Sequence, residues 1–415
     1  MRRRTALMRR SASDWAVRGV LAVIVAALGY LSVTHAVAYT LRSSAPASAR
    51  ALAPDDGRIN ALAAQRLAGA EASNADRARA DRLASLALRQ DATAVAAVST
   101  LGVNAQIRGD SVVARRLFSY AERLSRRELQ TQIWAIEDAV GRGDIAQALR
   151  HYDIALRTSL AASELLFPIL GTAMADPAIR TALVRTLSGQ PMWRDAFINY
   201  AARNSPDPRV TATLFVDLRR AGVPIGAEAQ LTIVDTLITG GFAGEAWSYY
   251  TSIHQGADRR VSRDPRFSAN LATPSQFDWV AINSGGIATS TQGIFDFSVP
   301  ASVGGPMLQQ LQLLTPGEYL LEGHSIGIDQ STEERPYWTL ICEDGRELGR
   351  IAMLNSADAN GRFAGRFTVP ARECQAQTLV LIARPSEAAS GQSGQIDQVR
   401  LRPVPTVGKE QGVAS

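Results

Sequence analysis

Hydrophobic and polar positions divide the chain into three regions. Residues 19–41 contain no Asp, Glu, Lys or Arg and form one uninterrupted apolar run. In residues 57–255 the apolar positions recur at the spacing of amphipathic helices, whereas residues 275–404 contain runs of strict alternation, such as FDFSV at 295–299. The pattern predicts a multi-domain chain in which a long apolar helix is followed by a helical domain and then by an antiparallel β-domain.

The apolar run predicts a membrane anchor. A helix of this length spans the roughly 30 Å hydrocarbon core of a bilayer. Residues 1–18 contain six arginines and one acid, Asp14, so the positive-inside rule predicts a cytoplasmic Arg-rich tail and export of the chain that follows the span. The alternative is a cleaved signal peptide, because the tripeptide AVA at 36–38 forms a small-x-small site. We favour an uncleaved single-pass anchor in the inner (cytoplasmic) membrane, followed by a linker at 42–56.

The net charge of +5 resides in this N-terminal tail, because the remaining residues carry as many acidic as basic groups. A neutral remainder is unlike the basic surface of nucleic-acid-binding domains, so no nucleic-acid partner is expected. Lys409 is the single lysine of the chain. Together with the alanine richness, this bias is typical of a GC-rich bacterial genome and predicts a periplasmic location for most of the chain.

A regular period runs through the helical region. The tripeptide RGD occurs at 108–110 and again at 142–144. Six further positions keep the same register: Ala114, Phe118 and Ala121, and then Ala148, Tyr152 and Ala155. The pattern resembles tetratricopeptide repeats, whose period is about 34 residues and in which small residues let paired helices approach and a Gly-Asp turn joins them. We therefore expect three units, at 61–94, 95–128 and 129–162, and expect both RGD copies to be turns and not adhesion motifs.

The resemblance also implies a partner-binding surface. Tetratricopeptide proteins bind other proteins mainly through the first helix of each unit, and the corresponding candidates here are Ser99, Val103, Gln106, Ile133 and Glu137. The alternative is an ordinary solvated face. Turn, alanine and aromatic spacing returns at 241–250 after several prolines, so we expect one solenoid over 57–255 with degenerate later repeats, and an envelope protein as its partner.

The C-terminal region predicts an antiparallel β-sandwich. Nine or ten short strands are separated by turn sequences such as Thr-Pro-Gly and Asn-Gly, and a charged linker at 256–274 precedes them. The segments at 314–319, 337–340 and 394–402 resemble galactose-binding-like jelly rolls and carbohydrate-binding modules. That resemblance makes Trp279, Tyr337 and Trp338 candidate sugar-binding aromatics, although each could instead pack in the core. Residues 405–415 are expected to be a disordered tail.

Residues that carry chemistry are few. Cys342 and Cys374 are the only cysteines, and an oxidising compartment favours a disulfide between them, with two buried thiols as the alternative. Of four histidines, only His324 lies outside the predicted membrane span and repeat helices. No hydrolase, metalloprotease or nucleotide-binding motif accompanies it. We therefore expect no catalytic residues, no metal and no cofactor.

The leading hypothesis is a membrane-anchored periplasmic adaptor. Its repeats would bind a protein partner, and its sandwich would bind a polysaccharide or a second protein. This arrangement resembles membrane-anchored repeat proteins of bacterial exopolysaccharide assembly and export. The alternatives are a purely structural envelope assembly factor, which binds no glycan, and a sugar-active hydrolase that uses His324.

Overall fold

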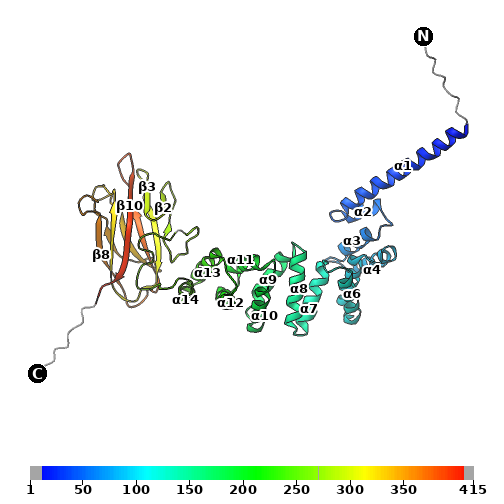
Figure 1. The fold of residues 1–415 in the computed structure, drawn as a ribbon, viewed down its shortest axis with the longest axis horizontal. Coiled ribbons are helices and arrows are strands. Elements are labelled where there is room, and N and C mark those ends of the chain that lie inside the picture. The colour runs from blue at the N-terminus through cyan, green and yellow to red at the C-terminus, as the bar shows by residue number, and fades with distance from the viewer. Residues whose placement is uncertain (1–11, 270, 406–415) are drawn as a thin grey trace, which may run out of the picture. The chain divides into compact units, whose positions relative to one another are not determined.

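The computed structural model describes residues 12–269 and 271–405, which form 14 helices and ten strands (Figure 1). A helical part precedes an antiparallel β-sandwich, as the sequence predicted. Most of the Arg-rich tail and nearly all of the predicted C-terminal tail lie outside the described residues. Contacts divide the chain into two compact units. The first unit holds residues 1–169, 181–186 and 191–193, and the second holds residues 170–180, 187–190 and 194–415.

Helix α1 (Ala12–Leu41) is the one helix of the described residues that is long and apolar enough to cross a membrane. Its side chains between Trp15 and Val33 are largely exposed. Its C-terminal end packs on the repeats, where Ala38 forms a buried apolar cluster with Ala49 and Ile59. The predicted linker at 42–56 is therefore wrong in part, since it contains α2 (Pro46–Leu52), which contributes Ala49 to that cluster.

Three helical hairpins follow in the first unit. They are α3 (Gly57–Leu67) with α4 (Asn74–Gln90), α5 (Val95–Ile107) with α6 (Ser111–Leu124), and α7 (Leu129–Gly141) with α8 (Ile145–Thr158). The second and third hairpins begin, turn and end at the same offset that separates the two RGD tripeptides. This confirms a helical repeat with the predicted period.

Both RGD segments form the inter-helix turns. Gly109 and Gly143 have φ values of 85° and 71°, which favour glycine. The following aspartates cap the second helices, because Asp110 accepts a hydrogen bond from the Val113 amide at 3.1 Å and Asp144 accepts one from the Gln147 amide at 3.0 Å. The turn chemistry inferred from the sequence is therefore the chemistry that joins these helices.

The remaining helices belong wholly or partly to the second unit. They are α9 (Ala162–Ala173), α10 (Pro177–Ser188), α11 (Arg194–Asn204), α12 (Pro208–Arg220), α13 (Ala227–Thr239) and α14 (Ala243–Ile253). Both α9 and α10 contain residues of each unit. The predicted solenoid over 57–255 is therefore not one compact body, and prolines at 168, 177 and 191 punctuate the sequence where it divides.

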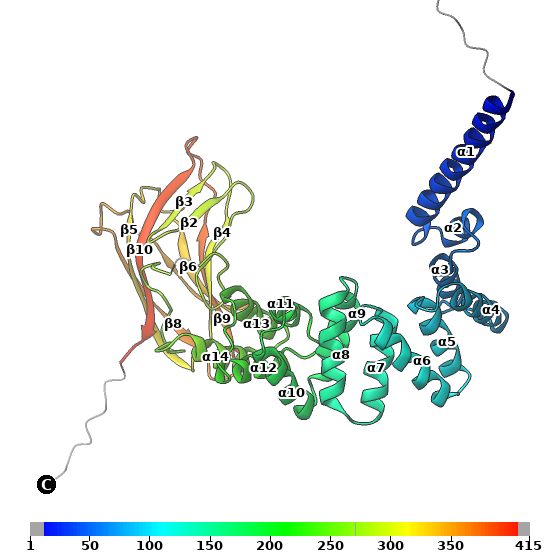
Figure 2. The same cartoon turned by 45° about the vertical axis from the view of Figure 1, so that its right-hand side comes forward.

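Two five-stranded antiparallel sheets form the sandwich (Figure 2). The first has the order β1-β4-β9-β6-β7 and the second the order β2-β3-β10-β5-β8. The first sheet contains Val280–Ala281, Gly305–Gln312, Gln377–Ala383, Tyr337–Cys342 and Glu347–Ala352 in that order. The second contains Ala288–Thr291, Phe295–Val299, Gln392–Pro403, Gly317–Ile326 and Arg362–Val369. The core between the sheets is aromatic and aliphatic.

A disulfide joins Cys342, at the end of β6, to Cys374. This is the pairing suggested by the sequence. The two cysteines are 32 positions apart in the sequence. A cross-link that closes a loop of that length stabilises a fold by about 3–4 kcal/mol, because it lowers the entropy of the unfolded chain.

The predicted linker at 256–274 is wrong, because this segment packs against the sandwich. The Ser262 amide donates to the Leu401 carbonyl at 3.0 Å, and the Leu401 amide donates to the Ser262 hydroxyl at 2.9 Å. Arg263 and Phe267 are buried. Part of the segment therefore runs alongside β10, and Phe267 belongs to the core between the sheets.

Candidate functional site

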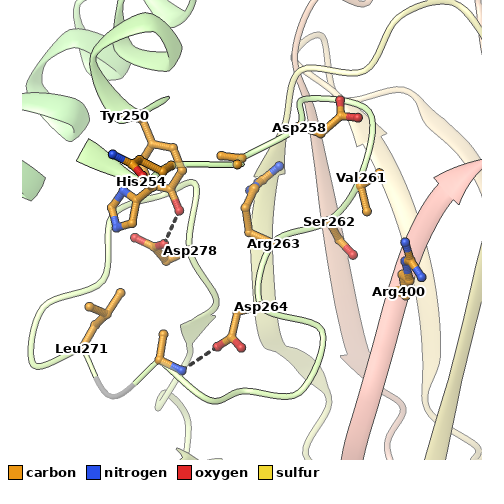
Figure 3. A pocket seen from close by; sticks show the side chains of 14 residues that line it. Tyr250, His254, Asp258, Val261, Ser262, Arg263, Asp264, Leu271, Asp278 and Arg400 are labelled. Carbon is orange, nitrogen blue, oxygen red and sulfur yellow. Dashed lines mark hydrogen bonds between the residues drawn. The ribbon is translucent and has the colours of Figure 1, made fainter. Parts of the chain in front are cut away.

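A pocket of about 550 Å³, lined by several charged and polar residues, lies within the second unit beside α14 (Figure 3). Its wall comes from the end of α14, from the segment that follows it and from β10. Its volume falls in the range of about 300–1,000 Å³ that is usual for small-ligand sites. The residues that define its chemistry are Tyr250, His254, Asp258, Arg263, Asp264, Asp278 and Arg400.

Tyr250 and Asp278 tie the last helix to the sandwich. The Tyr250 hydroxyl donates to one carboxylate oxygen of Asp278 at 2.7 Å (Figure 3). The other carboxylate oxygen accepts from the Ser275 amide at 3.0 Å and from its hydroxyl at 2.7 Å. Burial, followed by the neighbouring carboxylate, raises the pKa of Tyr250 above its ordinary value. Both side chains are therefore committed to holding the pocket wall.

Arg263 is a buried cation that has no carboxylate in direct contact within the described part of the chain. Its side chain is 8% exposed. It donates to the Phe277 carbonyl at 2.8 Å, to Gln312 Oε1 at 2.9 Å and to the Leu311 carbonyl. Burial lowers the pKa of Arg263 to about 10, so the guanidinium stays charged at neutral pH. It organises backbone and amide oxygens at the end of the core.

The other carboxylates of the pocket are also occupied. Asp264 accepts from the Ser268 amide at 2.8 Å and from the Ala269 amide at 2.9 Å. Asp258 pairs with Arg260, with 3.1 Å between the carboxylate and the guanidinium. The acidic groups therefore stabilise the loop that surrounds the pocket and are not free acceptors.

Two polar side-chain groups of the pocket lack a hydrogen-bond partner among residues 12–269 and 271–405. The His254 ring stacks on Tyr250 with 4.2 Å between ring centroids, and its Nδ1 is buried without a partner. The Arg400 side chain is exposed and makes no hydrogen bond or ion pair with the residues that the structure describes, although, after Arg402, its charge is one of the causes that lower the pKa of Glu322. Its cross-strand neighbour Glu322 is held by Arg402 at 2.7 and 3.2 Å, which keeps the pKa of Glu322 below its ordinary value. The pocket thus offers the Arg400 cation to a ligand rich in acceptors, whereas the His254 ring forms part of the wall with its Nδ1 buried.

The predicted aromatic platform is wrong. Trp338 is fully buried and Trp279 is 5% exposed, and both belong to the core between the sheets. Tyr337 points out of the core but is 8% exposed, because the guanidinium groups of Arg350 and Arg384 lie 5.0 and 4.9 Å from its ring centroid. None of the three rings presents an open face to a sugar.

The five protein-binding candidates differ in how far the structure exposes their side chains. Ser99 is buried and its hydroxyl donates to the Ala96 carbonyl at 3.1 Å, so its choice as a surface residue is wrong. Val103 and Ile133 are partly buried, and Val103 packs against the buried cluster around Phe118. Gln106 and Glu137 are exposed.

His324 has a carboxylate partner that the sequence did not suggest. Its Nδ1 lies 2.8 Å from Asp397 on the neighbouring strand β10, and the two side chains are 38% and 42% exposed. The residues are 73 positions apart, so only strand pairing brings them together. Among the described residues, no group of three or more His, Cys, Asp or Glu side chains could hold a metal ion.

Comparison with known proteins leaves the family open. No protein-family model matches the chain, and no curated protein matches it. Similar solved structures include accessory secretory proteins 1, 2 and 3 of Streptococcus pneumoniae (14% identity, 29% of this chain, 88% of that chain, TM-score 0.21).

A second similar structure is described as "CBM4 structure and function" (12% identity, 34% of this chain, 99% of that chain, TM-score 0.26). A third is the glycosylation-associated protein complex Gap123 of Streptococcus agalactiae (12% identity, 32% of this chain, 48% of that chain, TM-score 0.21). Similarity at this level carries no functional argument, so the site must be judged from its own geometry.

Proposed function

We propose that this protein is a membrane-anchored adaptor outside the cytoplasm, with α1 as the anchor. The helical repeats bind a protein partner, and the pocket beside α14 binds a glycan. We assign it no catalytic activity and place it in the assembly or export of an exopolysaccharide, in keeping with the family resemblance of its sequence.

The observation that carries the glycan proposal is the pattern of open and occupied groups in the pocket. A sugar presents many hydroxyl oxygens, which accept hydrogen bonds from charged donors such as a guanidinium. Here the carboxylates are occupied, whereas the Arg400 guanidinium is exposed and has no partner among the described residues. The half-buried His254 ring, which stacks on the buried Tyr250 ring, adds an apolar surface beside it. A pocket of about 550 Å³ fits a ligand of one or a few sugar residues.

Two features support the location. The exposed apolar side chains of α1 require a nonpolar environment, which a bilayer provides. The disulfide between Cys342 and Cys374 is typical of compartments outside the cytoplasm.

Glycan binding by the full-length chain in detergent tests the pocket. We expect a glycan array to identify a ligand, and expect the double variant Arg400→Gln, His254→Ala to weaken its binding at least tenfold. Arg362→Gln is the matched control, because Arg362 is an exposed arginine on β8 of the same sheet and does not line the pocket. Equal affinity of the double variant and the control for that ligand would refute the pocket assignment. Absence of any glycan ligand, with co-purification of an envelope protein, would favour the purely structural assembly factor.

A sugar-active hydrolase is the second candidate, and the His324–Asp397 contact favours it. A carboxylate that accepts a hydrogen bond from Nδ1 of a histidine leaves Nε2 available as a general base. Glycan turnover by the full-length protein that disappears in His324→Ala would establish this function in place of the adaptor.

A further inference from the structure

Arginines recur at two repeat positions on the second helix of each hairpin. The first position holds Arg82, Arg116 and Arg150, and the second holds Arg89, Arg123 and Arg157. Each step along either series equals the repeat period. All six side chains are exposed. We call these six residues the arginine ladder.

The two positions share one face of each helix. They are seven residues apart, which is almost two helical turns, so the two arginines of a helix lie about 10 Å apart along its axis. Ser85 and Ser119 lie between the arginines of α4 and α6, and Asp153 occupies the equivalent position on α8. Each helix therefore contributes a pair of guanidinium groups to the same side.

One side-chain contact is repeated at equivalent positions of both junctions between hairpins, which keeps the second helices in register. Helix α4 packs on α5, and α6 packs on α7. Across the first junction Asn104 donates to Asp81 at 2.6 Å. Across the second, Arg115 donates to Asp138 at 2.8 Å. Both partners of the second contact lie one repeat period after those of the first, so equivalent positions on α4, α6 and α8 face the same side of the array.

The ladder charges are largely uncompensated. Five of its arginines have no carboxylate partner among the described residues, and Arg157 alone pairs with an acid, Asp153, at 3.0 Å. In contrast, the arginines at the junctions are neutralised, as Arg108 is by Asp81 at 2.7 Å. Because the chain beyond residue 18 is neutral by composition, this face is a local concentration of positive charge.

We propose that the arginine ladder binds an acidic polysaccharide. A guanidinium pairs with a carboxylate through two parallel hydrogen bonds, and a regular array of such groups matches a polymer that carries carboxylates at regular intervals. Hot spots of protein–protein interfaces are enriched in Trp and Tyr as well as Arg. The aromatic ring beside the ladder, Tyr120, lies under Arg123, so the ladder offers charge without an open aromatic anchor. The Cys342–Cys374 disulfide favours a polymer found outside the cytoplasm over a nucleic acid. The ladder is a different surface from the pocket, so it would give the proposed adaptor a second binding site, which takes a polymer.

Binding of the full-length protein in detergent to polygalacturonate, with neutral dextran as the comparison, tests this proposal. We expect polygalacturonate binding that weakens steeply with salt, and no dextran binding. Replacement of three ladder residues, Arg82→Gln, Arg116→Gln and Arg150→Gln, is expected to reduce the affinity about tenfold, since exposed ionic contacts contribute a fraction of a kcal/mol each. The matched control removes three scattered exposed arginines, Arg66→Gln, Arg185→Gln and Arg372→Gln.

The outcomes separate the ladder from the pocket and from a general effect of positive charge. Absence of binding by the unmodified protein would overturn the proposal, as would an equal loss in the ladder variant and the scattered control. Tighter ladder-dependent binding to duplex DNA, polyglutamate or anionic phospholipid vesicles would assign the surface to another partner. Loss of polygalacturonate binding in the Arg400→Gln, His254→Ala variant alone would place the polymer in the pocket and leave the proposed function intact. Retention of binding in that variant, with loss in the ladder variant, supports the ladder.

Discussion

At the scale of single residues, His151 is a buried titratable group in the third hairpin. Its ring is 9% exposed, and its Nδ1 lies 2.8 Å from Gln132 Oε1. Burial is the largest cause that lowers the pKa of His151 below 6.5; Arg150 and Arg142 also lower it, and Glu122 raises it. The unfolded chain therefore binds the proton more tightly than the folded chain, and protonation favours unfolding.

This burial predicts a pH dependence of stability. Above pH 6.5 the histidine is neutral in both states and has no effect of this kind. As the pH falls below 6.5, the unfolded state is protonated first and the folded state loses stability. We expect the midpoint of thermal unfolding, followed by circular dichroism between pH 7.5 and pH 5, to fall less steeply for His151→Gln than for the unmodified protein. Parallel curves for the two proteins would contradict the assignment.

The burial of individual residues was predictable from the sequence only where the residues they contact are close along the chain. Phe118 and Tyr152 are buried as the repeat predicted, because their neighbours are local in sequence. Arg263 was assigned to a charged linker, since its acceptors lie 14, 48 and 49 positions away and only the folded sandwich brings them together. For the same reason, the sequence did not show which of Tyr337 and Trp338 faces the core and which faces away from it.

At the scale of elements, the repeat was predictable because its signals are local. A glycine at the turn, a capping aspartate and small residues at fixed spacing all act within one hairpin. The order of the β-strands was not predictable in this way, since β10 pairs with β3 and β5, which precede it by many residues. The pocket depends on that pairing and on the segment beside β10, so no local pattern indicated it.

Close helix packing gives a prediction at this scale. A Cβ atom at Gly102 of α5 would lie 2.9 Å from the Phe118 ring of α6. That ring cannot move away freely, because it stacks on Trp134 with 4.5 Å between ring centroids. We expect Gly102→Ala to destabilise the first unit by about 1–3 kcal/mol through overpacking, measured by denaturant unfolding and by faster hydrogen exchange in α5 and α6.

Gly141→Ala is the matched control. Gly141 is the last residue of α7, and beyond its own helix backbone and chain neighbours no atom of the described residues lies within 4 Å of an added Cβ there. Alanine is a better helix former than glycine, so this variant should be neutral or more stable by up to about 1 kcal/mol. A stabilising Gly102→Ala would show that the two helices do not depend on the glycine for their approach.

At the scale of the whole molecule, the chain forms two compact units instead of the single solenoid and separate sandwich that the sequence suggested. Composition marked the charged segment at 256–274 as a boundary, whereas the packing makes this segment part of the second unit. Helical periodicity continues through both units, so it could not show where one compact body ends and the next begins.

The packing of the first unit favours retention of α1 as a membrane anchor over its removal as a signal peptide. The candidate cleavage site ends at Ala38, which is 0% exposed in a helix that packs on Ala49 and Ile59. Cleavage there would require the last turns of α1 to unwind and would remove Ala38 from the cluster. We therefore expect mass spectrometry of the membrane-extracted protein to detect peptides from residues before Tyr39.

A substitution at Ala38 tests whether the apolar cluster of Ala38, Ala49 and Ile59 holds the end of α1 in place. Ala38→Asp places a carboxylate among apolar side chains, where an ionised group is strongly disfavoured. This variant should release the end of α1 from α2 and increase trypsin cleavage at Arg42, whereas Ala27→Ser, within the apolar run, should leave that cleavage unchanged. A purified chain that begins at Tyr39 would show that the segment is a signal peptide, and the adaptor would then act as a released protein because the helix that holds it to the bilayer would be absent.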